Sequence, residues 1–223
     1  MSVDEMQSYY GKRAAVYDES MGYNEPRKVA RLAPVIEQIT QLLAGRAILE
    51  IACGTGFWTQ FISKKARSIL ATDFNQSTLD QAGLKNLPSD KVSLKILDAY
   101  DLSEVPRNFD AAYAGDWLSH VPKKRMPEFL RGLHHCLNEG ARVVFCDQLP
   151  REHSLTGIYD QEGNHLQERV LPDGSRYQVI KHFMSDEEIR FIFSQFAEEL
   201  EILRFPECQR LVVTYRLAGQ SSR

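Results

Sequence analysis

The sequence predicts an α/β fold: a doubly wound, mostly parallel sheet of seven strands with an antiparallel last strand. Short apolar runs alternate with segments of helical periodicity from residue 47 to residue 147, which is typical of parallel strands joined by helices. The runs 199–203 and 210–215 are separated by a short link, which favours antiparallel pairing at the chain end. We expect one domain, 1–223, made of an N-terminal helical segment 1–25, a core 46–147 and an inserted hairpin 150–183.

Composition is that of an ordinary globular protein and argues against several function classes. Of 223 residues, 43% are hydrophobic and 26% charged, which suffices for one sizeable core. The net charge is −3 without a basic run, so we expect no nucleic-acid partner. No apolar stretch has the length of a membrane span, and the acidic start Met1–Glu5 lacks a signal-peptide core, which predicts a cytoplasmic protein. Four scattered cysteines without a C-x-x-C pair predict neither disulfides nor a metal site.

The first predicted element is an amphipathic helix at about residues 4–20, with Tyr10, Arg13 and Tyr17 at helical spacing. Its tyrosines and arginine are more than a packing helix requires, although a helix that packs its tyrosines on the domain is the alternative. Pro34 then fits the first turn of a second helix, which ends at Gly45.

The next stretch, residues 47–59, is a strand that leads through two glycines into a helix. Gly54 and Gly56 allow a sharp turn and a close approach of the backbone to a ligand. Backbone N–H groups at the helix start favour a negatively charged group there. A dinucleotide-binding fingerprint requires glycine or alanine three residues after the second glycine, but Thr59 occupies that position. An acidic residue, Glu50, precedes the glycines.

The arrangement Glu50-x-x-x-Gly54-x-Gly56 resembles the first motif of the class I S-adenosylmethionine-dependent methyltransferases, and the similarity extends from about Tyr9 to Leu217. This resemblance implies a Rossmann-like methyltransferase fold, S-adenosylmethionine (SAM) as cofactor, and a lid helix in segment 1–25. The residues it assigns to the cofactor are Tyr17, Glu50, Ala52, Cys53, Gly54, Gly56, Trp58, Asp73, Phe74, Asp98, Ala99, Tyr100 and Gly115.

The resemblance implies that the ends of the next two strands supply the nucleoside contacts. One strand ends on Asp73, which lies 23 residues after Glu50, where an acid in such folds accepts hydrogen bonds from ribose hydroxyls. The alternative for Asp73 is an N-cap of the following helix. The resemblance implies that Phe74 lies against one adenine face, that Asp98 receives the adenine amino group, and that Ala99 leaves room for the ring.

The segment that follows the strand 109–114 indicates the type of acceptor. Enzymes that methylate nucleobase or glutamine amines usually carry (Asp/Asn)-Pro-Pro-(Tyr/Phe) there, whereas this chain has Gly115-Asp116-Trp117. The loop and its trailing His120-Val121 resemble small-molecule methyltransferases, including those that act on quinone precursors. An imidazole ordinarily titrates near neutral pH, so His120 is our candidate general base, the alternative being a histidine that caps or packs the next helix.

A hairpin is predicted after the fifth strand, because the strand-like runs 165–171 and 175–181 flank the turn Pro172-Asp173-Gly174. The resemblance implies that this insertion caps the acceptor site. The candidates for acceptor binding are Tyr10, Arg13, Trp117, Arg169 and Tyr177.

The implied reaction is transfer of a methyl group from SAM to an O, N, S or C nucleophile of a small molecule by in-line displacement. Two alternatives remain open. One is a non-catalytic SAM-binding subunit, and the other is an NAD-dependent oxidoreductase, against which Thr59 and the antiparallel chain ending count. We expect a monomer or a homodimer.

Overall fold

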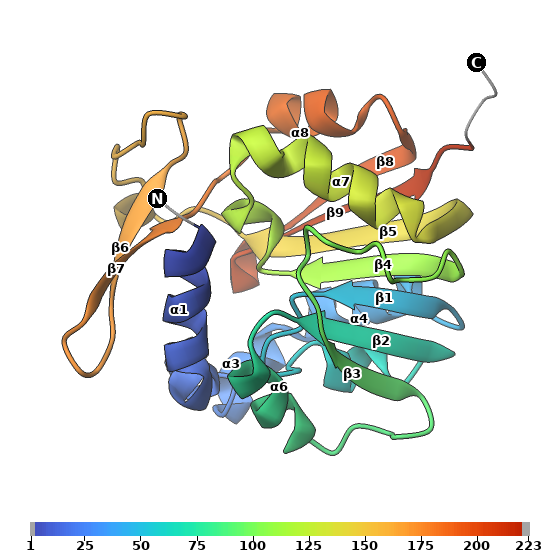
Figure 1. Cartoon of the computed structure of the whole chain (residues 1–223), viewed down its shortest axis with the longest axis horizontal. Helices are drawn as coiled ribbons and strands as arrows, with labels where there is room; N and C mark the ends of the chain where they lie inside the picture. Colours follow the sequence, from blue (N-terminus) through green and yellow to red (C-terminus); the bar gives the residue numbers. More distant parts are fainter. Residues whose placement is uncertain (1–2, 220–223) are drawn as a thin grey trace.

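The computed structural model describes residues 3–219; the first two residues of the expected lid segment and the last four of the expected domain lie outside them. One seven-stranded sheet has the order β3-β2-β1-β4-β5-β9-β8 (Figure 1). The five strands β1 to β5 pair in parallel, and β9 pairs antiparallel with both β5 and β8. The predicted fold class is therefore confirmed. The strands are β1 Ala47–Ile51, β2 Ser68–Asp73, β3 Val92–Ile96, β4 Phe109–Gly115, β5 Leu137–Gln148, β8 Ala197–Phe205 and β9 Arg210–Leu217.

Helices cover both faces of the sheet, so its central strands are buried on both sides. Alternate strand residues divide between two apolar clusters: Ile48 packs with α4, and its neighbour Leu49 packs with α7 and α8. The helices are α3 Pro26–Arg31, α4 Ala33–Leu42, α5 Thr59–Ile62, α6 Gln76–Gly83, α7 Met126–His135 and α8 Asp186–Phe193. A capping box joins Ser185 and Glu188 at the start of α8.

The N-terminal segment differs from the single helix expected at 4–20. It forms α1 Val3–Arg13, a 3₁₀ turn Ala14–Val16, and α2 Tyr17–Met21. The reason is tertiary contact, because Asp18 on α2 is held by Thr55 and Lys85 of the central domain. Helix propensity and hydrophobic periodicity describe only the local sequence, so they cannot predict these contacts of Asp18.

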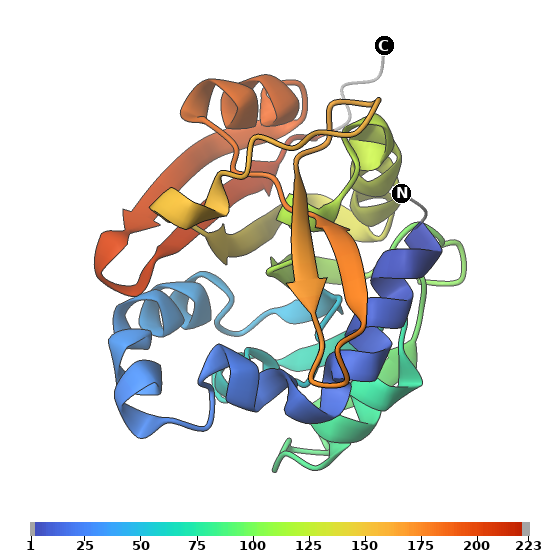
Figure 2. The same cartoon turned by 90° about the vertical axis from the view of Figure 1, so that its left-hand side faces the viewer.

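The hairpin predicted after the fifth strand is present as β6 Leu166–Val170 and β7 Arg176–Ile180, paired antiparallel. Figure 2 looks onto the carboxyl ends of the parallel strands, in front of which the hairpin and α1 lie side by side. Met6 and Tyr9 of α1 pack with Leu171 and Val179 in a small apolar cluster of their own. The two added elements therefore form one cover.

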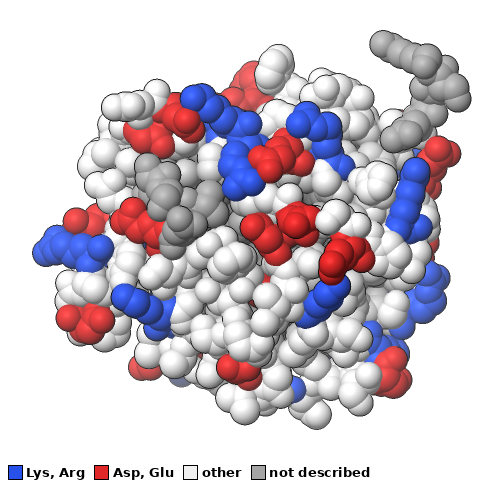
Figure 3. Space-filling model, in the orientation of Figure 1, with Lys and Arg blue, Asp and Glu red and all other residues white. Residues whose placement is uncertain are grey.

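The surface mixes both charge signs on the face shown in Figure 3. Within residues 3–219, no helix combines the length and apolar character needed to cross a membrane.

Candidate functional site

A crevice opens at the carboxyl ends of the first four strands, where ligands bind in doubly wound sheets. Strand ends form its floor and α1 and α2 form its cover. The lining residues are Met6, Gln7, Tyr10, Tyr17, Ala52, Gly54, Thr55, Asp73, Phe74, Asn75, Thr78, Leu97, Asp98, Ala99, Gly115, Asp116, Trp117 and His120. Eight of the predicted cofactor residues are therefore brought together, along with three of the residues predicted to act on the acceptor.

The turn after β1 presents backbone to the crevice. Ala52 has a φ of 51° and Gly54 a φ of 57°, so both lie in the left-handed region that favours glycine. A Cβ built on Gly54 would meet nothing within 4 Å, which means that it would project into the open crevice. Gly56 differs, because a Cβ there would lie 3.1 Å from Ala82. Gly54 therefore leaves space for a ligand, whereas Gly56 lets the turn pack on α6.

Asp73 links the glycine turn to α6 while it lines the crevice. Its Oδ2 accepts a hydrogen bond from the Gly54 backbone N–H at 2.9 Å. Its Oδ1 accepts from the Asn75 N–H at 2.9 Å and the Thr78 hydroxyl at 2.8 Å. A carboxylate offers about four acceptor sites, so the three donors leave about one for a ligand. Asp73 thus supports the start of α6 and retains capacity toward the crevice, but it is not the N-cap that the alternative expected, because Asn75 occupies that position.

Phe74, which follows Asp73, also lines the crevice. The Phe74 side chain is 46% exposed and faces the crevice, although large apolar rings are usually buried. Asp98 and Ala99 line the same end of the crevice, and one Asp98 oxygen accepts from the Tyr100 N–H at 2.9 Å.

Five predicted cofactor residues do not line the crevice: Glu50, Cys53, Gly56, Trp58 and Tyr100. Trp58 fills the core beneath β4, so close to Gly115 that a Cβ on that glycine would lie 2.7 Å from the indole. Tyr100 packs under Arg125, whose guanidinium carbon lies 3.5 Å from the ring centroid. Among the described residues, neither carboxylate oxygen of Glu50 has a hydrogen-bond partner. Burial raises the pKa of Glu50 to about 8.

The cover is fastened to the glycine turn by one aspartate. Asp18 accepts hydrogen bonds from the Thr55 hydroxyl and from the ammonium of Lys85, which follows α6. Arg13 lies over the Tyr17 ring, 4.7 Å from its centroid, and donates to the Ser20 hydroxyl at 2.8 Å. Arg13 therefore braces the α1–α2 corner and does not itself line the crevice.

His120 is buried at the end of the crevice and joined to the cover. Its Nε2 lies 3.0 Å from the Tyr10 hydroxyl, and its Nδ1 contacts the Ile180 carbonyl oxygen. A carbonyl only accepts, so Nδ1 carries the proton and Nε2 accepts from Tyr10. Burial, followed by the charge of Lys181, holds the pKa of His120 well below its ordinary value. The imidazole is therefore neutral at pH 7, and Nε2 is free of a proton.

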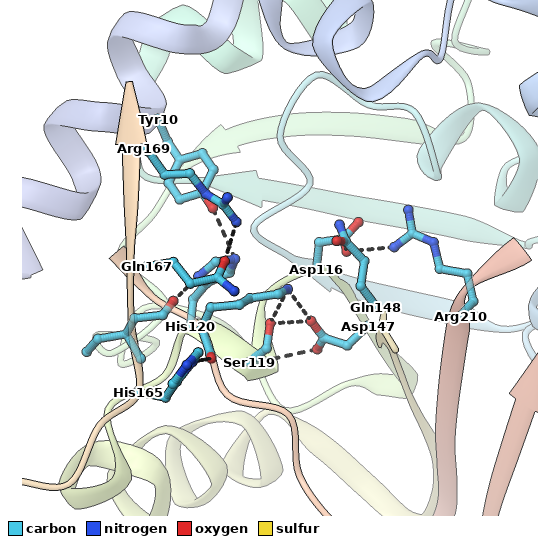
Figure 4. Close-up of polar contacts among 12 residues, drawn as sticks. Tyr10, Asp116, Ser119, His120, Asp147, Gln148, His165, Gln167, Arg169 and Arg210 are labelled. Carbon is cyan, nitrogen blue, oxygen red and sulfur yellow. Dashed lines mark hydrogen bonds and ion pairs between the residues drawn. The ribbon is translucent and has the colours of Figure 1, made fainter. Parts of the chain in front are cut away.

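Two buried ion pairs, which the sequence did not reveal, lie on one side of His120 (Figure 4). In the first, Asp116 accepts from Arg210 at 2.6 Å and from Gln148 at 3.1 Å. Burial favours the neutral form of Asp116, but Arg210 and then Lys181 keep its pKa below the ordinary value. Asp116 also has a φ of 54°, a strained conformation of the kind found at functional sites.

The second pair joins Lys181 of the hairpin to Asp147 of β5 at 3.3 Å, with Lys181 also donating to the Ser119 hydroxyl at 2.7 Å. Ser119 in turn donates its hydroxyl and its backbone N–H to Asp147. Because Ser119 precedes His120, this network fixes the loop that carries the imidazole.

The two hairpin residues predicted to bind the acceptor occupy different positions. Tyr177 packs on Tyr9 of α1, accepts from Lys12 at 2.8 Å and lines neither the crevice nor the second cavity. Arg169 instead lines a second cavity next to the crevice. Among residues 3–219, no cluster of three or more histidine, cysteine, aspartate or glutamate side chains is arranged to hold a metal ion.

Comparison with known proteins assigns residues 48–140 to a methyltransferase domain family. A demethylmenaquinone methyltransferase from Clavibacter sepedonicus is 29% identical over 65% of this chain and 55% of its own length. A ubiquinone biosynthesis O-methyltransferase from Pseudomonas syringae pv. tomato is 29% identical over 46% of this chain and 44% of its own. The chain thus spans about half the length of the curated relatives it matches.

Solved structures match over almost the whole chain. The DhpI complex with S-adenosylhomocysteine (SAH) is 25% identical, with a TM-score of 0.77 and 97% coverage of both chains. The DhpI-SAM-HEP complex is 27% identical, with a TM-score of 0.77, and the match covers 95% of this chain and 96% of that one. The 1,6-didemethyltoxoflavin-N1-methyltransferase from Burkholderia thailandensis shares the fold at 13% identity, with a TM-score of 0.63 and coverage of 97% and 88%.

Proposed function

Because the chain belongs to the class I SAM-dependent methyltransferases, we propose that it transfers the methyl group of SAM to a nucleophilic atom of a small molecule. One observation carries the proposal. The acidic crevice at the strand ends is closed by an aromatic cover and ends at a buried, neutral imidazole.

The crevice suits SAM. Asp73, Asp98 and Asp116 line it and, among residues 3–219, no lysine or arginine does, which matches a cofactor with a sulfonium and an ammonium group. The open backbone at Gly54 would hold the methionine part. The remaining acceptor capacity of Asp73 would hold the ribose, and the exposed Phe74 ring would hold the adenine.

When bound, SAM supplies an electrophilic methyl group on a positively charged sulfur. Most of the rate enhancement can then come from positioning, because the acceptor lone pair must approach the methyl carbon in line. Tyr10 and Tyr17 close the crevice from above, and the Asp18 contacts hold them in place. The cover also excludes water, which would compete with the acceptor.

An acceptor that has to lose a proton needs a base at the methyl position. Nε2 of His120 accepts the Tyr10 hydroxyl proton in a hydrogen bond, so it can take a proton either directly or through that hydroxyl. Burial raises the pKa of Tyr10 well above its ordinary value, which keeps the phenol protonated and able to relay. This geometry favours an enzyme over a non-catalytic subunit, which would have no need of an imidazole at this position.

His120→Ala tests the catalytic role. For an acceptor that bears a proton, we expect a loss in turnover of about 100-fold or more. Because the pKa of His120 is lowered, the wild-type rate should stay flat through neutral pH and fall only in acid, when Nε2 becomes protonated. The assay is transfer of a labelled methyl group to a panel of phenols, quinone precursors, amines and thiols.

His135→Ala is the matched control, since His135 lies exposed on α7. A His120→Ala protein with full turnover at every pH would rule out the base. Absence of transfer to every acceptor class by a wild-type protein that binds SAM would favour the non-catalytic alternative.

A further inference from the structure

A second cavity, of about 570 Å³, adjoins the crevice. Its lining comes from the N-terminal segment, the end of β5, the hairpin and the start of β9. The two spaces share a wall, because Asp116 lines the crevice and accepts hydrogen bonds from Gln148 and Arg210, which line the cavity. Small-molecule sites commonly have volumes of about 300–1,000 Å³, so the cavity is large enough for an acceptor.

The charge of this cavity is opposite to that of the crevice. Two acidic side chains, Glu168 and Glu207, line it, and Glu168 is paired with Arg176 at 2.7 Å. Six basic side chains line it: Lys28, Arg31, Arg151, Arg169, Lys181 and Arg210. The cavity therefore has an excess of positive charge and favours an anionic occupant.

Half of these basic side chains are paired within the protein. Lys28 pairs with Glu25 at 2.7 Å, and the pairs Lys181–Asp147 and Arg210–Asp116 are those described above. Within the described part of the chain, the other three, Arg31, Arg151 and Arg169, form no ion pair with a carboxylate. Arg31 and Arg151 are exposed to water, whereas Arg169 is half-buried. Arg169 is thus the one with most to gain from an anion.

The Arg169 guanidinium is fixed in orientation. Gln167, which is only 5% exposed, accepts from the Arg169 Nη2 and donates its own amide to the Ser154 carbonyl at 2.7 Å. Figure 4 shows Arg169 projecting from the hairpin toward Tyr10 and His120. Burial dominates the pKa shifts of those two residues, and the Arg169 charge contributes to both, which places it near the reacting end of the crevice.

We propose that the methyl acceptor carries an oxyanion group, either a carboxylate or a phosphoryl group, which Arg169 binds in this cavity. The planar fork of a guanidinium matches both groups with two parallel hydrogen bonds. An acceptor held in this way would place its nucleophile toward His120 and the crevice. This inference rests on the proposed function, because it names the substrate class of the same site.

The test is calorimetric titration of the SAH-saturated protein with inorganic phosphate and, separately, with acetate. We expect saturable binding of at least one probe, and the probe that binds identifies the phosphoryl or the carboxylate source. Arg169→Ala should weaken that binding about 10- to 100-fold. Arg169→Lys keeps the charge but loses the planar fork of the guanidinium. Its affinity for the anion should therefore lie between those of wild type and Arg169→Ala. Arg176→Ala is the matched control, because Arg176 lies on the same hairpin, is paired with Glu168 and has a 69% exposed side chain.

The SAH titration of each protein separates this inference from the proposed function. Retained SAH affinity in Arg169→Ala shows that the variant is folded. If wild type binds SAH but neither anion saturably, or if Arg169→Ala binds the anion as wild type does, the inference is overturned and the proposed function stands. If wild type fails to bind SAH, the proposed function itself is wrong.

Discussion

At the scale of single residues, we propose that Asp73 both supports the glycine turn and binds the ligand. It holds the glycine turn and α6 together through three hydrogen bonds, and its remaining acceptor capacity faces the crevice. We expect Asp73→Asn to keep the size of the side chain but to weaken SAH binding about 10- to 100-fold, because a hydrogen bond to a charged group is worth roughly 1.5–3 kcal/mol. Isothermal calorimetry measures the affinity.

Asp80→Asn is the control, because it makes the same change on the exposed side of α6, where Asp80 accepts from Gln76. Equal affinities in wild type and Asp73→Asn would contradict the ribose assignment.

At the scale of elements, the cover depends on Asp18, which joins α2 to the glycine turn and to Lys85 just after α6. The side chains of Asp18 and Lys85 are only 20% and 18% exposed, so this pair is better protected from screening than a surface ion pair. We expect Asp18→Ala to raise the dissociation rate of SAH about ten-fold, equivalent to about 1.4 kcal/mol, with a smaller change in association. Stopped-flow fluorescence measures both rates.

Glu19→Ala removes an exposed acid from the same short helix and should leave both rates unchanged. If Asp18→Ala and Glu19→Ala release SAH equally slowly, the cover does not retain the ligand through Asp18.

Elements formed by local pattern were predictable from the sequence, and those formed by distant contacts were not. The alternation of strands and helices predicted the sheet, and the positions of the strand ends predicted Asp73, Asp98 and Gly115 as crevice residues. The break between α1 and α2 was missed, because the contacts of Asp18 are tertiary. Trp58 was assigned to the cofactor from its place beside the glycines, but the helix that starts there turns the indole into the core.

The buried ion pairs were missed for a related reason. Arg210 reaches Asp116 because β9 lies against β5 with Arg210 opposite Gln148, a register that alternation does not specify. A signal was present for Asp116 in its position directly after Gly115 at a strand end. Nothing in the local sequence marks Lys181 as the partner of Asp147.

At the scale of the whole molecule, buried titratable groups should limit stability in both pH directions. Burial lowers the pKa of His134 and His182 to about 4, so the folded protein binds fewer protons than the unfolded chain from about pH 4 to 6.5. Unfolding free energy should therefore fall as the pH drops through this range. Burial raises the pKa of Glu50 to about 8, so ligand-free protein should also lose stability as the pH rises from 6.5 to 8.

Glu50→Gln isolates the alkaline part of this behaviour. The amide resembles the protonated acid and does not titrate, so the variant should lose less stability than wild type above pH 6.5. One titrating group changes the unfolding free energy by roughly 1.4 kcal/mol per pH unit. Urea unfolding at a series of pH values provides the measurement. Parallel pH profiles for the two proteins between pH 6.5 and 8 would refute the burial of an uncharged Glu50.

The central claim is that the crevice at the strand ends is a SAM site, and calorimetric titration of the chain with SAM, SAH and NAD tests it most directly. We predict saturable binding of SAM and SAH at one site per chain and no binding of NAD. Binding of NAD without SAM or SAH would contradict the account and indicate hydride transfer instead.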